Sequence, residues 1–71
     1  MTDNVQHPTH YTTGGIECIQ AIKASMSPEE YQGYLKGNLQ KYVWRYRHKN
    51  GVEDLKKAQV YLNWLIAELL E

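Results

Sequence analysis

The sequence has little of what commonly stabilises a small protein, beginning with cysteine. A single cysteine, Cys18, stands among its 71 residues, which excludes an internal disulfide. Its apolar neighbours favour a buried thiol in a reducing compartment. A chain of this length buries only about 60% of the surface that its unfolded form exposes. We therefore expect a homo-oligomer, because self-association supplies the burial that a thin core lacks.

The chain also lacks an excess of charge and a long apolar run. Eight Lys and Arg residues balance eight Asp and Glu residues, which excludes a general attraction to nucleic acids and to anionic membranes. No apolar run approaches the length of a membrane span, and residues 1–10 have neither the basic start nor the apolar stretch of a signal peptide. The sequence therefore predicts a cytoplasmic protein with no membrane partner and no specific nucleic-acid partner.

Phenylalanine is absent, whereas six tyrosines and two tryptophans are present. Every large aromatic side chain therefore carries a polar group that prefers a partner or an interface. Trp44 and Trp64 lie on predicted helices and are candidates for a subunit contact or for stacking on a base. The subunit contact is the stronger interpretation, because a thin core needs more burial.

The overall pattern predicts an all-α fold. No segment alternates between apolar and polar residues with a period of two, so we assign no sheet. Residues 1–13 are polar and favour an extended arm, which belongs to a single domain covering residues 1–71. A first short helix is expected from Ile16 to about Ser25, because isoleucines recur there at helical spacing.

The clearest helix start lies in the middle of the chain. Ser27, Pro28 and Glu30 match a capping box, so a second helix must begin there. Gly33 and Gly37 each cost about 1 kcal/mol in a helix. They make a bend near this point plausible and favour a close approach of backbone or ligand. The apolar stripe of this helix consists of Tyr31, Tyr34, Leu35, Leu39, Tyr42, Val43 and Tyr46.

The end of the chain completes a helical hairpin. Residues 49–51 read Lys-Asn-Gly, which ends a helix with a basic turn and a residue that tolerates left-handed backbone. The last helix is expected from about Glu53, antiparallel to the one before it. The fold is thus three to four short helices with an αα-hairpin. The apolar stripe of the last helix is Leu55, Ala58, Leu62, Leu65, Ile66 and Leu69.

The N-terminal arm is dense in functional groups. His7, His10 and Tyr11 lead directly into Gly14 and Gly15 at the expected helix start. Backbone N–H groups at such a junction can hold a phosphate, and histidines can add donors. The alternative, a solvated loop that contacts no ligand, is as well supported by the sequence as phosphate binding. A zinc site is disfavoured, because two histidines fall short of a tetrahedral set.

A second constellation is a row of polar and basic residues on the long helix. Asn38, Lys41, Arg45 and His48 fall along one side of it, and Lys36 lies near its beginning. Between Leu35 and residue 49 there is no acid at all. Such a local cationic face on a neutral molecule suits a small anion better than a polyanion.

A solvated basic face held by ion pairs is the competing interpretation of this row. Glu53 and Lys57 form an i, i+4 pair worth a few tenths of a kcal/mol. Asp54 is in reach of Arg45 or Lys49 across the hairpin, and surface ion pairs are common. The asparagine and the two glycines favour the binding interpretation. No Walker-type loop and no dense carboxylate set for magnesium is present, so cations must stabilise any transferred phosphate.

Several short motifs stand in a fixed order between His7 and about Leu65. They are His7-Pro8-Thr9-His10-Tyr11, Gly14-Gly15-Ile16-Glu17-Cys18, Gly33-Tyr34-Leu35-Lys36-Gly37-Asn38, Lys41-Tyr42, Trp44-Arg45-Tyr46, Lys49-Asn50-Gly51, Glu53-Asp54-Leu55-Lys56-Lys57-Ala58 and Tyr61-Leu62. In this order and spacing the chain resembles a small phage-encoded family of unknown function whose members are often described as nucleotide-kinase-like.

The resemblance implies a phage nucleotide-binding protein in the host cytoplasm. A relative in a coliphage suggests a nucleoside monophosphate kinase that acts on deoxynucleotides, with magnesium as an optional cofactor. That relative forms a large oligomer. Two alternatives stay open: a protein that sequesters nucleotides or cyclic nucleotide immune signals, and a helical module that binds a host protein. The positions that match the family motifs as ligand-binding residues are His7, His10, Tyr11, Lys36, Asn38, Lys41, Arg45, Lys49, Asp54 and Lys57.

Overall fold

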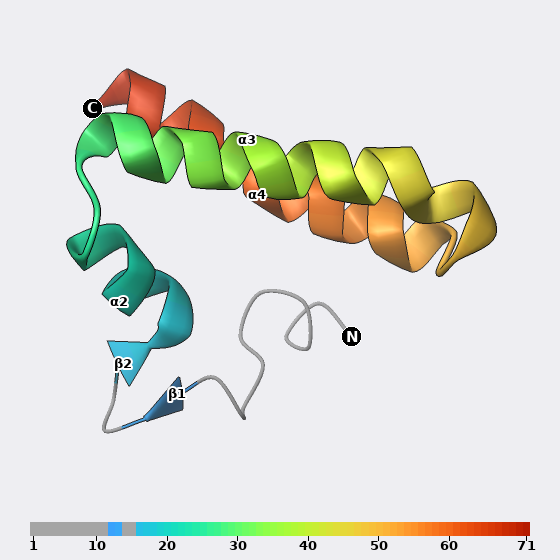
Figure 1. Ribbon diagram of the computed structural model, residues 1–71, viewed down its shortest axis with the longest axis horizontal. Helices are drawn as coiled ribbons and strands as arrows, with labels where there is room; N and C mark the ends of the chain where they lie inside the picture. The colour runs from blue at the N-terminus through green and yellow to red at the C-terminus, as the bar shows by residue number, and fades with distance from the viewer. Residues whose placement is uncertain (1–11, 14–15) are drawn as a thin grey trace.

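The structure is a computed structural model and describes residues 12–13 and 16–71. Within these residues the helices are α2 (Cys18–Ala24), α3 (Pro28–Arg45), the 3-10 helix η2 (Tyr46–His48) and α4 (Val52–Leu70) (Figure 1). Two-residue strands β1 (Thr12–Thr13) and β2 (Ile16–Glu17) pair antiparallel before α2. The all-α prediction is confirmed. This short pairing is its one exception in the described part of the chain, and two residues are too few to show a period-two pattern.

The body of the molecule is the predicted αα-hairpin. Helices α3 and α4 lie antiparallel, side by side along the long axis of the molecule, and α2 sits beneath the end where α3 begins and α4 finishes (Figure 1). The Nζ atom of Lys23 lies 2.7 Å from Oε2 of Glu68, which links α2 to the last turns of α4. None of the described helices combines the length and the apolar character needed to cross a membrane.

Helix α3 starts where the sequence predicts. Ser27 Oγ accepts a hydrogen bond from the backbone N–H of Glu30 at 3.2 Å, and Glu30 Oε1 accepts one from the backbone N–H of Ser27 at 2.8 Å. Pro28 occupies the first helical position. This reciprocal cap satisfies two backbone donors that a helix start leaves without partners, so the boundary is fixed locally.

The bend suggested for the start of α3 is absent, because the helix runs unbroken from Pro28 to Arg45 through Gly33 and Gly37. A Cβ atom built on either glycine would meet nothing within 4 Å. Within the described residues, therefore, no other segment of the chain packs closely enough against α3 to explain the two glycines.

The connection between α3 and α4 starts with a 3-10 helix, which is wound more tightly than an α-helix. The α-helix ends at Arg45, four residues before the predicted basic turn, and continues as η2. Gly51 then adopts a positive φ of 58°, which only glycine adopts without strain. Its N–H donates to the carbonyl of Tyr46 at 2.8 Å. The glycine at the predicted turn thus permits the reversal into α4.

The core of the hairpin is smaller than the apolar stripes predict. Among the described residues, the buried hydrophobic side chains are Tyr31, Leu35, Ala58 and Val60. Several residues of the predicted stripes keep 40% or more of their surface exposed, because two helices cover only the side on which they face each other. These residues are Val43, Leu55, Leu62, Ile66 and Leu69.

Cys18 also departs from its prediction, since the structure exposes it. Helix α2 is packed on one side only and none of its residues is buried. The apolar neighbours Ile19 and Ile22 are half-buried, whereas Cys18, the first residue of the helix, points outward. Apolar neighbours in the sequence therefore do not bury a residue when the helix that carries it is itself peripheral.

Candidate functional site

Three cationic side chains from two helices gather around one aromatic ring. Lys41 Nζ lies 4.4 Å from the centroid of the Tyr42 ring, Arg45 Cζ lies 4.8 Å from it, and Lys57 Nζ lies 5.6 Å from it. Each cation is within the distance at which an aromatic quadrupole attracts it. Lys41 and Arg45 come from α3, whereas Lys57 comes from α4. We call Lys41, Tyr42, Arg45 and Lys57 the cation cluster.

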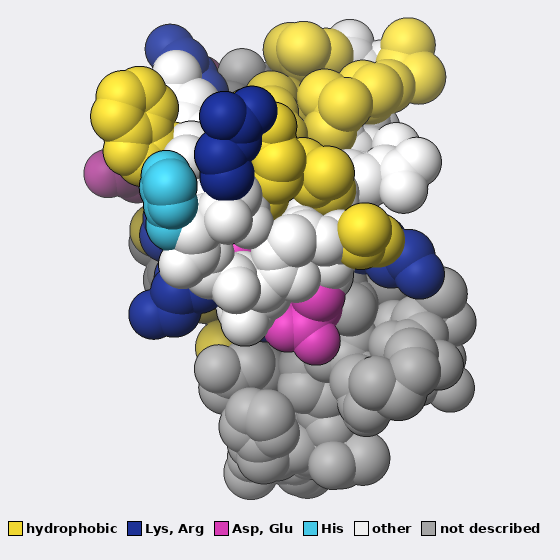
Figure 2. All heavy atoms as spheres, turned by 90° about the vertical axis from the view of Figure 1, so that its right-hand side faces the viewer, with side chains coloured by type: hydrophobic (Ala, Val, Ile, Leu, Met, Phe, Trp, Pro, Cys, Tyr) yellow, Lys and Arg dark blue, Asp and Glu magenta, His cyan; other side chains and the backbone are white. Residues whose placement is uncertain are grey.

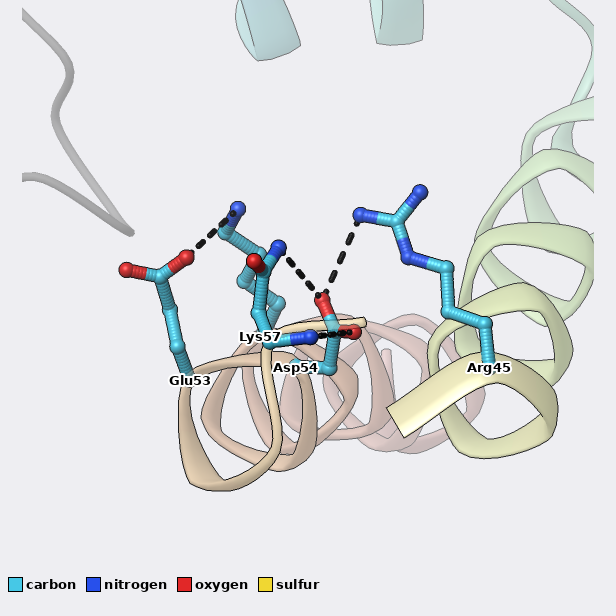
Figure 3. A network of polar contacts seen from close by, with 5 residues as sticks. Arg45, Glu53, Asp54 and Lys57 are labelled. Carbon is cyan, nitrogen blue, oxygen red and sulfur yellow. Dashed lines mark hydrogen bonds and ion pairs between the residues drawn. The ribbon is translucent and has the colours of Figure 1, made fainter. Parts of the chain in front are cut away.

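A buried carboxylate fixes the position of Arg45. Asp54 is 0% exposed, and its Oδ1 lies 3.3 Å from Arg45 Nη2. Oδ2 accepts a hydrogen bond from the backbone N–H of Asn50 at 3.1 Å, and Oδ1 accepts one from Asn50 Nδ2 at 3.4 Å. Figure 3 shows Arg45 reaching from α3 towards Asp54 at the start of α4. The predicted link across the hairpin is therefore made with Arg45.

Asp54 stays ionised in this setting. Burial by itself would raise the pKa of Asp54, but the hydrogen bonds from the Asn50 backbone, the Arg45 side chain and the Asn50 side chain outweigh it, and the pKa lies below its ordinary value of 3.8. A negative charge is thus held beneath the guanidinium. Both oxygens are engaged inside the fold, so Asp54 acts by positioning Arg45.

This arrangement predicts an acid-sensitive part of the stability. Because the pKa of Asp54 is lower in the folded state than in the unfolded state, unfolding takes up a proton at low pH. The stabilisation is complete above the unfolded value near 3.8 and declines as the pH falls through it towards the folded pKa. Urea unfolding across this range should show the decline, and Asp54→Asn should lack it. A variant with an unchanged acid slope would contradict the assignment.

The cluster carries more positive charge than its own acids balance. Lys57 Nζ lies 3.5 Å from Oε2 of Glu53, an exposed i, i+4 pair that contributes little. No carboxylate of the described residues pairs with Lys41. The Nε atom of Arg45 is buried without a hydrogen-bond partner among the same residues. A buried donor without a partner costs about 1 to 3 kcal/mol.

A row of aromatic rings leads away from the cation cluster along the hairpin. The Tyr61 ring lies 5.8 Å from that of Tyr42 and 6.2 Å from that of Tyr34, and Trp64 meets Tyr61 edge-on at 5.4 Å. Such contacts between centroids are typical of favourable aromatic pairs. The row places flat, partly accessible rings next to the cations. Trp44, by contrast, is 89% exposed and belongs to no such row.

The structure separates the predicted site residues into groups. It brings Lys41, Arg45 and Lys57 together. Lys36 stands five residues before Lys41, about 140° around the helix, and therefore faces elsewhere. Lys49 is exposed in the connection after η2. His7, His10 and Tyr11 lie outside the described residues.

Asn38 is partly engaged within its own helix. Its Nδ2 donates to the carbonyl of Tyr34 at 3.0 Å. Asn38 lies on the same side of α3 as Arg45, which follows seven residues later. Tyr42 was predicted only as a member of the apolar stripe, and its position at the centre of the cation cluster was not predicted. Its place in the sequence between Lys41 and Arg45 was a signal for that position, but the contact between Lys57 and its ring depends on how α4 packs on α3.

Among the residues that the structure describes, no three His, Cys, Asp or Glu side chains gather closely enough to hold a metal ion. The cation cluster is instead made of positively charged side chains around one aromatic ring. It combines two ammonium groups with one guanidinium, and the guanidinium of Arg45 adds directional N–H donors to the charge.

Comparisons with known proteins agree with an origin among phages. A family profile described as a protein of unknown function, DUF3310, matches residues 5–63. The chain is 40% identical over 66 residues to the gene 1.7 protein of Enterobacteria phage T3, an alignment that covers 86% of the chain and 40% of that protein. It is 38% identical over 64 residues to the nucleotide kinase gp1.7 of Escherichia phage T7, covering 83% of the chain and 33% of that protein.

The chain thus spans well under half the length of these phage relatives. No solved structure matches it.

Proposed function

Because the chain belongs to the DUF3310 family, with relatives in phages T3 and T7, we propose that it binds nucleotides through their phosphate groups at the cation cluster. The observation that carries this proposal is the meeting of Lys41, Arg45 and Lys57 around Tyr42. One relative is named a nucleotide kinase, and a phosphate group is the ligand that three neighbouring cations suit best.

Each cation has a distinct part in this proposal. Arg45, held from below by Asp54, offers its remaining N–H donors to phosphate oxygens in a fixed orientation. Lys41 is exposed and has no carboxylate partner among the described residues, so its charge is available to the ligand. Lys57 exchanges its weak contact with Glu53 for a phosphate oxygen. His7 and His10 would add donors from the arm.

The aromatic row supplies a surface for the base. Tyr61 and Trp64 lie beyond Tyr42 along the hairpin and are half-buried. An aromatic face stacks on any nucleobase for about 1 to 3 kcal/mol and gives little base selectivity. A nucleotide laid along the row would place its phosphates at the cluster and its base near Trp64.

Phosphoryl transfer between nucleotides is the finer form of the proposal. Catalysis of this reaction is largely positioning and charge stabilisation, which cations can supply. A protein that only sequesters nucleotides or cyclic nucleotides would use the same cluster without converting its ligand. Incubation with mono-, di-, tri- and cyclic nucleotides, followed by chromatography, separates the two. Converted ligand supports the kinase, and intact bound ligand supports sequestration.

Lys41→Ala and Arg45→Ala are each expected to weaken nucleotide affinity about tenfold, since a charge-assisted hydrogen bond contributes roughly 1.5 kcal/mol or more. Lys41→Ala should keep its helical content, because that side chain is exposed. Arg45→Ala also removes the partner of the buried Asp54, so its affinity is measured at a temperature at which circular dichroism shows the variant folded. Isothermal titration with the nucleotide that most raises the thermal midpoint provides the measurement.

The lysine pair Lys56 and Lys57 offers a matched control for this site. Both stand on α4, but Lys56 points away from Tyr42. Lys57→Ala should lower affinity, whereas Lys56→Ala should not. Wild-type affinity in both Lys41→Ala and Arg45→Ala would remove the cation cluster as the binding site.

A further inference from the structure

An exposed tryptophan stands beside the cation cluster on the outer side of α3. Trp44 is 89% exposed, the largest exposed fraction among the large hydrophobic side chains of the described residues. It lines an open hollow of about 940 Å³. A large aromatic side chain that the fold leaves in water indicates a site for a partner. The other residues that line the hollow are Leu39, Gln40, Lys41, Val43 and Arg45.

Two cations stand between Trp44 and the Tyr42 ring. Around the axis of α3, Lys41 lies about 60° from Trp44, whereas Trp44 and Tyr42 lie about 160° apart. Lys41 and Arg45 both fall in the arc between the two aromatic side chains. Residues 41–45 span about one turn of the helix, so the four side chains lie at one level. The two cations are therefore flanked by an aromatic surface on each side.

The surroundings of Trp44 are basic. Lys41 precedes it by three residues, and Arg47 and His48 follow it by three and four, so these side chains lie about one turn away. All three are exposed. The sequence places no acid between residues 35 and 49. Figure 2 looks onto the joined end of the hairpin and shows Lys and Arg side chains beside hydrophobic ones. These surroundings suit a partner that joins a flat group to negative charges.

We propose that Trp44 stacks on the base of a second nucleotide, and that the phosphates of this nucleotide share Lys41 and Arg45 with those of the first. A nucleotide joins a flat base to charged oxygens, which is the combination that an exposed aromatic ring beside cations fits best. The first nucleotide is the one that lies along the row from Tyr42 to Trp64, so this inference rests on the proposed function. It adds a second site to the same cluster.

Lys41 and Arg45 have enough donors for two ligands. An ammonium group carries three N–H donors and a guanidinium carries five. Asp54 contacts Nη2 of Arg45, and no carboxylate of the described residues pairs with Lys41. Arg47 adds a further positive charge on the side of Trp44. The positive charge around Trp44 thus continues the charge of the cluster.

Two nucleotides with their phosphates at the same cations have the arrangement that phosphoryl transfer requires. A phosphate oxygen of a nucleoside monophosphate attacks the terminal phosphorus of a nucleoside triphosphate. The bond from that phosphorus to its bridging oxygen breaks, and two nucleoside diphosphates result. Cations that contact both phosphate groups hold the two reactants in line and neutralise the transferred group.

Isothermal titration of the whole chain tests the second site. The probes are the monophosphates of the four common nucleosides, which have no second phosphoryl group to transfer, and the matching dinucleoside pentaphosphates, in which five phosphates join two nucleosides. The wild type is expected to bind two monophosphates per chain but one linked ligand. The linked ligand should bind at least tenfold more tightly, since its second base binds intramolecularly.

Trp44→Leu should weaken the second monophosphate about tenfold or more and keep the first, because a stacked base is lost on one side only. Trp44→Tyr keeps an aromatic face and should retain both. The exposed position of Trp44 means that neither variant threatens the fold. Lys41→Ala should weaken both nucleotides, because its ammonium group is shared.

Each failure gives a distinct result. One monophosphate per chain that Lys41→Ala weakens and Trp44→Leu leaves unchanged would overturn the second site and keep the proposed function. No binding of any probe would overturn the proposed function itself. Two monophosphates still bound by Trp44→Leu, together with altered sedimentation of that variant, would assign Trp44 to a protein contact and overturn the inference.

Discussion

Asp54→Ala is expected to lower the thermal midpoint of the protein by roughly 10 °C or more, among the largest effects of any single substitution. The carboxylate is fully buried and joins Arg45 on α3 to Asn50 in the connection. Its removal leaves the guanidinium without its counter-charge and the Asn50 N–H without an acceptor. Both losses fall on the end of the hairpin where α3 and α4 meet.

The same variant should also weaken nucleotide binding if the cation cluster is the site. Arg45 would lose the contact that orients it, so affinity should fall even under conditions in which the variant is fully folded. Thermal unfolding followed by circular dichroism, and titration at a temperature well below the midpoint, measure the two effects. Glu53→Ala is the matched control, because this neighbouring acid is exposed and makes only a weak pair with Lys57.

A small effect of Asp54→Ala, no larger than that of Glu53→Ala, would mean that the buried ion pair does not hold the hairpin together. Asp54→Asn distinguishes charge from shape. It keeps the size of the side chain and can accept from Asn50, but it offers Arg45 no charge. Its stability should fall between those of the wild type and the alanine variant.

Leu35→Ala is expected to cost about 2 to 5 kcal/mol, because it empties the best-covered position in the core. Leu35 is 0% exposed and is the largest fully buried apolar side chain of the described residues. In a domain of this size such a loss corresponds to roughly 10 °C or more in the thermal midpoint. The variant should be largely unfolded at physiological temperature if the wild type is only marginally stable.

Leu70→Ala serves as the control for this core substitution. Leu70 is 82% exposed at the end of α4, so the same change of side chain removes few contacts within the chain. Chemical denaturation of both variants at low protein concentration, where association contributes least, gives the comparison. Equal losses from Leu35→Ala and Leu70→Ala would show that the hairpin core is not where the structure places it.

The sequence by itself determined the helices and where α3 and α4 begin. Helix α2 begins at Cys18 and not at the predicted Ile16, which lies in β2. The capping box at Ser27 and the positive φ of Gly51 depend only on neighbouring residues, so both can be predicted without knowledge of the rest of the fold. The antiparallel hairpin followed from the short connection between two long apolar patterns. The charge pattern likewise predicted a cationic region on α3, and Lys41 and Arg45 are part of the cation cluster.

Only the tertiary structure decided which residues of each pattern meet. Leu35 and Val43 belong to the same stripe, yet one is fully buried and the other is 48% exposed, because α4 covers a narrower strip of α3 than the stripe occupies. Lys57 joins the cluster, and Asp54 becomes a buried anchor, through contacts between helices. Periodicity fixes the direction of a side chain around its own helix, whereas burial and ion pairing depend on the position of the neighbouring helix, which no local pattern records.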